Sequence, residues 1–302
     1  MNESRPRAAL QNFVRRIRWT ARRALRRPVR IVVEMRWRLG DEIMAIPIYE
    51  GIKRRYPFCH LTVWCNYPDV LWRNPHVDSI RDASANPPVC DRYILLRGAP
   101  RLVKRIDHYA SRADIPIPPM RPRLYYDDWA NAALAQHGLR AKEFVAVCTG
   151  ATWETKRWPR ECWQSLCDAL ELDGQTLVQL GHDDVALHVA HAMQEKTSVR
   201  EAACMLRGAR LLITHDTGLM HLALAVGTPV LALFGPTDPA FLVRDTEALS
   251  VLTNGRPCQG CWNHREDNLT EGVCPLGIVP CMGSLTVDSV LARARELFGN
   301  GA

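Results

Sequence analysis

Residues 211–239 constrain the fold of this chain more than any other segment. In this segment two apolar runs flank a helical pattern. The first run, Leu211–Thr214, stops at the polar turn His215-Asp216-Thr217-Gly218. The second run, Val230–Phe234, stops at Gly235-Pro236-Thr237-Asp238-Pro239. A strand, a helix and a second strand in this order predict a βαβ unit of a parallel sheet. Both polar turns then lie at carboxyl ends of strands, where open α/β sheets bind ligands.

The same alternation recurs along the chain. Four polar turns follow expected strands, namely Gly40-Asp41, Thr149–Lys156, Gly181–Asp184 and His215–His221. We therefore expect two Rossmann-like domains facing a cleft, with a boundary near residue 140, so that the domains span 29–140 and 141–302. The expected strands are 30–35, 61–65, 93–96, 144–148, 175–180, 211–214 and 230–234. The expected helices are 43–56, 127–137, 159–170, one from the 181–184 turn through Met193, 201–207 and 219–226.

Positive charge is concentrated in the first 30 residues, which hold ten arginines and one acid. The net charge of +7 is thus +9 in this segment and −2 in the remainder. Apolar residues recur at helical spacing between the arginines, which predicts a basic amphipathic helix in residues 1–28. Residues 5–27 of such a helix suit peripheral contact with an anionic membrane surface. A helix packed on the enzyme or on an oligomer partner is the alternative. Nucleic acid is not expected, because the rest of the chain has no basic stripe.

Neither a membrane span nor a signal peptide is expected. No apolar run approaches the roughly 18 residues that a span requires, and the N-terminus lacks an apolar core of the signal-peptide kind. We therefore expect a cytoplasmic protein, whose membrane contact, if it has one, is peripheral and at the inner face.

The turn Thr149–Lys156 carries residue types that suit a substrate with a diphosphate leaving group. Lys156 supplies a compact positive charge for phosphate. Thr149 and Thr152 supply hydroxyl donors.

The turn at Asp216 offers an anion site of a second kind. Asp216 and Thr217 can cap the following helix, whose N-terminal amides then hold an anion. Gly218 and His221 share the helical face of Thr217. An ordinary capped helix is the alternative. Asp183 can bind a ribose hydroxyl, or equally cap a helix.

The first strand ends at Asp41, a carboxylate that can act as general base on an acceptor hydroxyl. The alternative role of Asp41 is an N-cap. The loop is Gly-Asp and not G-x-G-x-x-G, so no dinucleotide cofactor is indicated. The chain contains no Asp-x-Asp pair to hold a catalytic cation. Lys156 and a helix N-terminus could replace that cation.

Four segments of the chain resemble glycosyltransferase family 9, the family of the ADP-heptose heptosyltransferases of lipopolysaccharide core assembly. They are RLGDEIMAIPIYEGIKRRYP (38–57), TGATWETKRWP (149–159), HDTGLMHLALAVGTPVLALFGPTDP (215–239) and MGSLTVDSVL (282–291). The resemblance implies a GT-B fold and an inverting transfer without a catalytic metal. It also implies an N-terminal acceptor domain and a C-terminal donor domain.

Site residues follow from the same resemblance, position by position. Asp41 matches the family's proposed base, and Lys156 matches its phosphate-binding lysine. Asp183 lies near a ribose-binding acid of the family. The donor-binding turn corresponds to Asp216, Thr217, Gly218 and His221.

The last four of the eleven cysteines form a separate pattern, Cys258-x2-Cys261-x12-Cys274-x6-Cys281. Four thiolates at such spacing suit a structural zinc or iron site, with His264 as a spare ligand. Free thiols and disulfides are the alternatives. The segment is similar to the four-cysteine iron site of a family branch, the autotransporter heptosyltransferases.

Two functions of different classes follow. The first is an enzyme that moves a heptose from a nucleotide-sugar donor to a glycan or to a protein Ser/Thr. The second is a non-catalytic protein that binds sugar nucleotides or acts as a scaffold.

Overall fold

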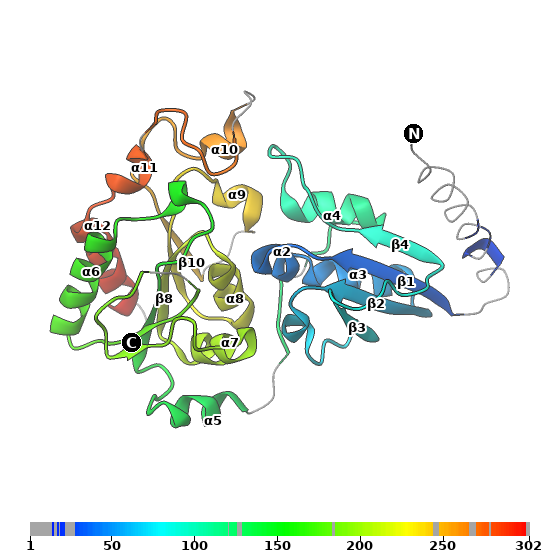
Figure 1. The fold of residues 1–302 in the computed structure, drawn as a ribbon, viewed down its shortest axis with the longest axis horizontal. Coiled ribbons are helices and arrows are strands. Elements are labelled where there is room, and N and C mark those ends of the chain that lie inside the picture. The colour runs from blue at the N-terminus through cyan, green and yellow to red at the C-terminus, as the bar shows by residue number, and fades with distance from the viewer. Residues whose placement is uncertain are drawn as a thin grey trace. The chain divides into compact units, whose positions relative to one another are not determined.

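The structure is a computed structural model that describes residues 14, 17, 19–21, 28–119, 121–125, 129–182, 185–243, 248–265, 270–277 and 279–299. It forms two compact units, each built on a parallel sheet (Figure 1). Unit 1 comprises Met1–Pro100 and Arg105–Tyr125, and unit 2 comprises Arg101–Lys104 and Tyr126–Ala302. The α/β class with parallel sheets is thus confirmed.

The boundary between the units lies between Tyr125 and Tyr126, earlier than the expected position near residue 140. The reason is α5 (Trp129–Gln136), which packs against α7 (Val199–Gly208) of unit 2. The helix expected at 127–137 thus exists, but it packs on α7 of the second unit.

Unit 1 has a four-stranded sheet of order β3-β2-β1-β4, with all strands parallel. The strands are β1 (Val29–Met35), β2 (Cys59–Cys65), β3 (Ser79–Asp82) and β4 (Arg92–Leu95). The helices are α2 (Leu39–Met44), α3 (Ile46–Arg55), η1 (Pro68–Leu71) and α4 (Arg105–Ala113). The chain proceeds outward from β1 to β3 and then returns to the other side of β1. The carboxyl ends of β1 and β4 therefore flank a switch point of the kind that binds ligands.

The helix expected over 43–56 is divided in two at Ala45, which is the C-cap of α2 and the N-cap of α3. Pro47 stands in the first turn of α3, where a missing N–H costs nothing, whereas inside a continuous helix it would remove a hydrogen bond. Helix α4 was not expected at all.

Unit 2 has a six-stranded parallel sheet of order β10-β9-β8-β5-β6-β7. Its strands are β5 (Phe144–Cys148), β6 (Thr176–Gln179), β7 (His191–Ala192), β8 (Leu211–His215), β9 (Val230–Leu233) and β10 (Leu249–Leu252). Besides α5 and α7, its helices are η2 (Glu154–Lys156), α6 (Arg160–Leu172), α8 (Gly218–Val226), α9 (Pro239–Leu242), α10 (Cys261–His264), α11 (Pro280–Gly283) and α12 (Val287–Gly299). Helices α6 and α12 cover one face of the sheet, and α7 and α8 cover the other (Figure 1).

The helix expected from the 181–184 turn through Met193 is wrong for the described residues 185–193, which are extended and lead into β7. The buried side chain of Gln179 holds this segment. Its amide donates to the carbonyl of Val185 at 2.6 Å, and its oxygen accepts from the Leu187 N–H at 3.0 Å. Hydrogen bonds to a buried side chain on the preceding strand thus override the local helical pattern.

The basic N-terminal segment lies mostly outside the described residues. Among those described, Trp19 packs edge-on against Tyr56 with 5.2 Å between ring centroids, and the Arg92 guanidinium lies 5.5 Å over the Trp19 ring. At Trp19, therefore, the segment contacts the sheet domain of unit 1 through Tyr56 and Arg92. Across the described parts of the chain, no helix is both long enough and apolar enough to span a bilayer.

Candidate functional site

The switch point of unit 2 lies between β5 and β8, whose carboxyl ends pair as neighbours. The loop after β5 carries Lys156 in η2, and the loop after β8 carries Asp216. The Lys156 Nζ lies 2.5 Å from Asp216 Oδ2. The exposed fractions of their side chains are only 14% and 6%. The structure thus joins two predicted site residues that are 60 positions apart.

Asp216 is held ionised by the groups around it. Burial alone would raise the pKa of this carboxyl, but the charges of Lys156 and His221 lower it below its usual range. The hydroxyl of Thr237 also donates to Asp216 Oδ2, at 2.8 Å. Because Thr237 belongs to the turn after β9, three loops meet at this carboxylate.

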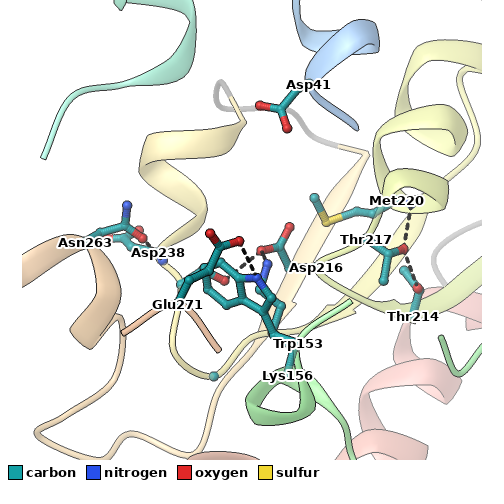
Figure 2. Close-up of polar contacts among 12 residues, drawn as sticks. Asp41, Trp153, Lys156, Thr214, Asp216, Thr217, Met220, Asp238, Asn263 and Glu271 are labelled. Atoms are coloured by element: carbon teal, nitrogen blue, oxygen red, sulfur yellow. Dashed lines mark hydrogen bonds and ion pairs between the residues drawn. The ribbon is translucent and has the colours of Figure 1, made fainter. Parts of the chain in front are cut away.

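Lys156 has a second neighbour, the indole ring of Trp153, whose centroid lies 4.3 Å from Nζ. The Trp153 Nε1–H donates to Glu271 Oε1 at 2.7 Å. Figure 2 shows the Lys156, Asp216, Trp153 and Glu271 side chains gathered at one place. The indole fixes one side of the ammonium group and ties it to the C-terminal segment that contains Glu271.

The N-terminus of α8 completes this site. Thr217 is its N-cap, and the Thr217 Oγ1 accepts from the Met220 N–H at 3.4 Å, as Figure 2 shows. The expected cap is therefore confirmed for Thr217 but wrong for Asp216, which is occupied by Lys156 and Thr237. Gly218 opens the helix, and His221, one turn on, is buried. Gly227, with a φ of 82°, ends the helix in the left-handed conformation that favours glycine.

The remaining predicted residues of unit 2 differ in their surroundings. Thr149 is buried and its hydroxyl accepts from the Gln179 amide at 3.1 Å, whereas Thr152 is exposed. Asp183 lies outside the described residues. His215 is a core residue, since its Nε2 accepts from the Trp158 N–H at 2.9 Å and burial lowers its pKa to about 3.

At the switch point of unit 1, Asp41 lies in the first turn of α2 and is 7% exposed. No side chain caps α2, so the N-cap role for Asp41 is wrong. The Tyr109 hydroxyl donates to Asp41 Oδ1 at 2.8 Å. The Arg105 Nε lies 3.4 Å from the same oxygen. Both partners belong to α4.

The four cysteines of the C-terminal segment are free thiols, with no disulfide among them. Burial raises the pKa of Cys261, as do the nearby Cys258 and Cys274 thiols, and Cys281 is affected in the same way by burial, Cys258 and Cys261. Even so, no three His, Cys, Asp or Glu side chains within the described ranges are arranged to hold a metal ion. His264, the spare ligand, instead lies 2.5 Å from Asp238 Oδ2.

Sequence reasoning missed several residues of these two sites, namely Arg105, Tyr109, Trp153, Thr237 and Glu271. Thr237 lies in a polar turn at the end of a strand. The same signal identified the site residues Lys156 and Asp216 from the sequence. Tyr109 lies in the sequence Asp107-His108-Tyr109 of α4, and nothing in that local pattern connects it with Asp41, 68 positions away.

Residues 90–270 match the family model of glycosyltransferase family 9 (heptosyltransferase), which is more than half of the chain. Lipooligosaccharide heptosyltransferase 2 of Haemophilus influenzae is 24% identical over 294 residues, covering 70% of this chain and 84% of the relative. Lipopolysaccharide heptosyltransferase 1 of Pseudomonas aeruginosa is 34% identical over 128 residues, covering 39% of this chain and 36% of the relative.

Two solved structures have the same fold. The Escherichia coli ADP-heptose lipopolysaccharide heptosyltransferase II gives a TM-score of 0.69 at 18% identity, covering 90% of this chain and 100% of that one. The iron-containing dodecameric glycosyltransferase TibC of enterotoxigenic E. coli gives a TM-score of 0.76 at 17% identity, covering 91% and 77%.

Proposed function

Because this chain belongs to glycosyltransferase family 9, the heptosyltransferase family, we propose that it transfers a heptose from ADP-heptose to a hydroxyl of the lipopolysaccharide core. It is a glycosyltransferase, and the non-catalytic scaffold is set aside. The names of its relatives, which are heptosyltransferases 1 and 2, support the sugar and the core acceptor. The single observation that carries the assignment to a site is the Lys156–Asp216 pair beside the N-terminus of α8.

The donor half of the proposal rests on unit 2. Lys156 neutralises the diphosphate of the donor, and the amides in the first turn of α8 donate to its oxygens. Asp216 and Thr237 position the lysine. Thr149, Thr152, Asp183, Gly218 and His221 complete the proposed donor-binding set. No divalent cation is required, because lysine and the helix terminus carry the charge that develops on the leaving group.

The acceptor half rests on Asp41. Its carboxylate accepts the proton of the acceptor hydroxyl while that oxygen forms a bond to the anomeric carbon. The bond between this carbon and the donor diphosphate breaks at the same time, and the electron pair leaves with ADP. A single displacement of this kind inverts the anomeric configuration.

The test of the function is ADP release from purified protein and ADP-heptose, with lipopolysaccharide that lacks core heptose as acceptor. Asp41→Asn should reduce turnover by at least a thousandfold and leave the Kd for donor within about twofold, because the base acts on the reaction step alone. Asp82→Asn is the matched control, since Asp82 also ends a strand of the unit 1 sheet. A near-native rate in Asp41→Asn would contradict the base.

We propose a Ser/Thr-containing protein as the second acceptor. Two features favour it: the cysteine segment, and the likeness in fold between this chain and TibC. The same assay with an autotransporter passenger peptide in place of lipopolysaccharide decides between them. Transfer to one acceptor and not to the other, seen as a heptose mass increment, identifies the class.

We also propose that Cys258, Cys261, Cys274 and Cys281 hold a structural iron or zinc. The support is their spacing and the effect of the neighbouring thiols on the pKa values of Cys261 and Cys281. The described geometry does not itself form a metal site, and no catalytic step depends on one. Elemental analysis of anaerobically purified protein tests this proposal, and a metal content near zero would overturn it.

The basic segment 5–27 is proposed as a peripheral membrane contact. Sedimentation with vesicles that contain anionic lipid should retain the full chain and release a variant without residues 1–27. Equal retention of both would contradict the contact.

A further inference from the structure

Asp41 is bound on one side only. Both of its partners, Tyr109 and Arg105, contact Oδ1. Within the described residues Oδ2 has no partner, and it is absent from the buried polar atoms that lack a hydrogen bond, so it is open to solvent. A carboxylate with one oxygen fixed and the other open is oriented to accept a proton at the open oxygen.

The sheet of unit 1 explains how two distant segments meet here. Asp41 follows β1, and α4 follows β4, and these two strands are paired neighbours. Because the chain goes from β1 outward to β3 and then returns to β4 on the other side of β1, the segments after β1 and β4 border the same switch point. Tyr109, a fully buried side chain, and Arg105, one turn earlier in α4, thus reach the carboxylate together.

We infer that Tyr109 and Arg105 are positioning residues for the proposed base, holding Asp41 Oδ1 so that Oδ2 meets the acceptor hydroxyl. This inference rests on the proposed role of Asp41. Tyr109 supplies a neutral hydrogen-bond donor to this oxygen, and Arg105 places a positive charge beside it. Neither residue takes part in proton transfer.

The surroundings keep the tyrosine in its donor form. Burial raises the pKa of Tyr109 well above its usual value, and the charge of Asp41 raises it further. The other titratable groups near this pair are Glu42 on the helix of Asp41 and Tyr49 on α3. Tyr49 is itself kept protonated by burial, so the phenols add no charge near Asp41.

The test is Tyr109→Phe, which removes one hydroxyl and keeps the ring in its pocket. We expect kcat to fall about 10- to 100-fold, the range for loss of a hydrogen bond to a charged group. The KM for ADP-heptose should be unchanged.

Tyr56→Phe is the matched control in the same unit, since its hydroxyl accepts from Arg92 at 2.6 Å and does not contact Asp41. It should leave kcat at the wild-type value. Arg105→Gln should lower kcat as Tyr109→Phe does, with the KM for ADP-heptose unchanged, and Arg105→Lys, which keeps the charge, should restore kcat in part.

A double-mutant cycle separates positioning from general damage. If Tyr109 acts through Asp41, Tyr109→Phe should not lower the residual rate of Asp41→Asn any further. A wild-type kcat in Tyr109→Phe, an equal loss in Tyr56→Phe, or an additive loss in the double variant would each overturn the inference. A near-native rate in Asp41→Asn would instead refute the proposed base itself.

Discussion

At the scale of single residues, the site of unit 2 depends on how one lysine is surrounded. Lys156 has a carboxylate on one side and an indole ring on another, at 2.5 Å from Asp216 and 4.3 Å from the Trp153 centroid. A largely buried ammonium needs such partners, because an unpaired charge there would be strongly unfavourable.

Replacing Lys156 by Met should weaken ADP binding about 10- to 100-fold, since one charge-assisted contact to phosphate is lost. Titration calorimetry with ADP measures the effect. Lys196→Met is the control, because Lys196 belongs to the same unit and its ammonium group donates to the Ala192 carbonyl at 2.8 Å. Equal Kd values for the wild type and Lys156→Met would remove Lys156 from the donor site.

Trp153→Phe should raise the KM for donor about threefold to tenfold, because the Nε1–H bond to Glu271 is lost while an aromatic face stays near Lys156. Glu271→Gln keeps the acceptor oxygen and should have a smaller effect. Steady-state kinetics with varied ADP-heptose measures both. A larger effect of Glu271→Gln would show that its charge, and not the hydrogen bond, matters.

At the scale of elements, the sequence predicted the strands best. A buried parallel strand is a continuous apolar run, so β1, β5 and β8 could be placed within a residue or two. The helix α8 was equally clear, from its Thr217 cap to its Gly227 end.

Other elements depended on partners that a local pattern does not contain. The extended residues 185–193 follow from hydrogen bonds with the buried Gln179 side chain. Helix α4, which carries Arg105 and Tyr109, lies in a proline-rich stretch whose local pattern gave no clear helix. The candidate site was thus predictable where turns follow strands, but its supporting contacts came from elements placed only by tertiary packing.

Thr217→Ala should lower the free energy of unfolding of unit 2 by about 1 kcal/mol, the usual effect of removing an N-cap. Thr217→Ser keeps the capping oxygen and should stay within a few tenths of a kcal/mol of the wild type. Urea denaturation followed by tryptophan fluorescence measures both. If the two variants were equally destabilised, the methyl group and not the cap would be responsible.

At the scale of the whole molecule, each unit carries a buried titratable group, and the two groups make the free energy of unfolding change with pH in opposite directions. In unit 1, burial raises the pKa of Glu42 to about 7, although the Asn66 and Tyr67 N–H groups donate to its carboxylate. In unit 2, burial lowers the pKa of His215 to about 3. The folded state therefore favours the neutral form of both groups.

The two units should consequently respond to acid in opposite directions. The contribution of Glu42 to the free energy of unfolding is fully present below pH 4.5 and is lost as the pH rises through about 7. The His215 contribution is fully present above pH 6.5 and is lost as the pH falls towards about 3. Between pH 7 and pH 5, each changes by roughly 2 kcal/mol.

Hydrogen exchange, corrected for the intrinsic rate, can follow each unit separately. From pH 7 to pH 5 the amides of β1 should gain protection and those of β8 should lose it. Glu42→Gln and His215→Gln should each abolish the change in its own unit. Parallel trends in both units would contradict the assignment.

The Lys156–Asp216 ion pair has a consequence for turnover. In the proposed cycle, Asp216 and Thr237 hold Lys156 while it binds the diphosphate, and ADP leaves the site after each transfer. The ammonium group keeps its carboxylate partner when ADP departs, so no buried charge is left unpaired and product release carries no large electrostatic penalty. An enzyme with a permanently unpaired lysine would bind its spent nucleotide more tightly and would be limited by inhibition from its own product.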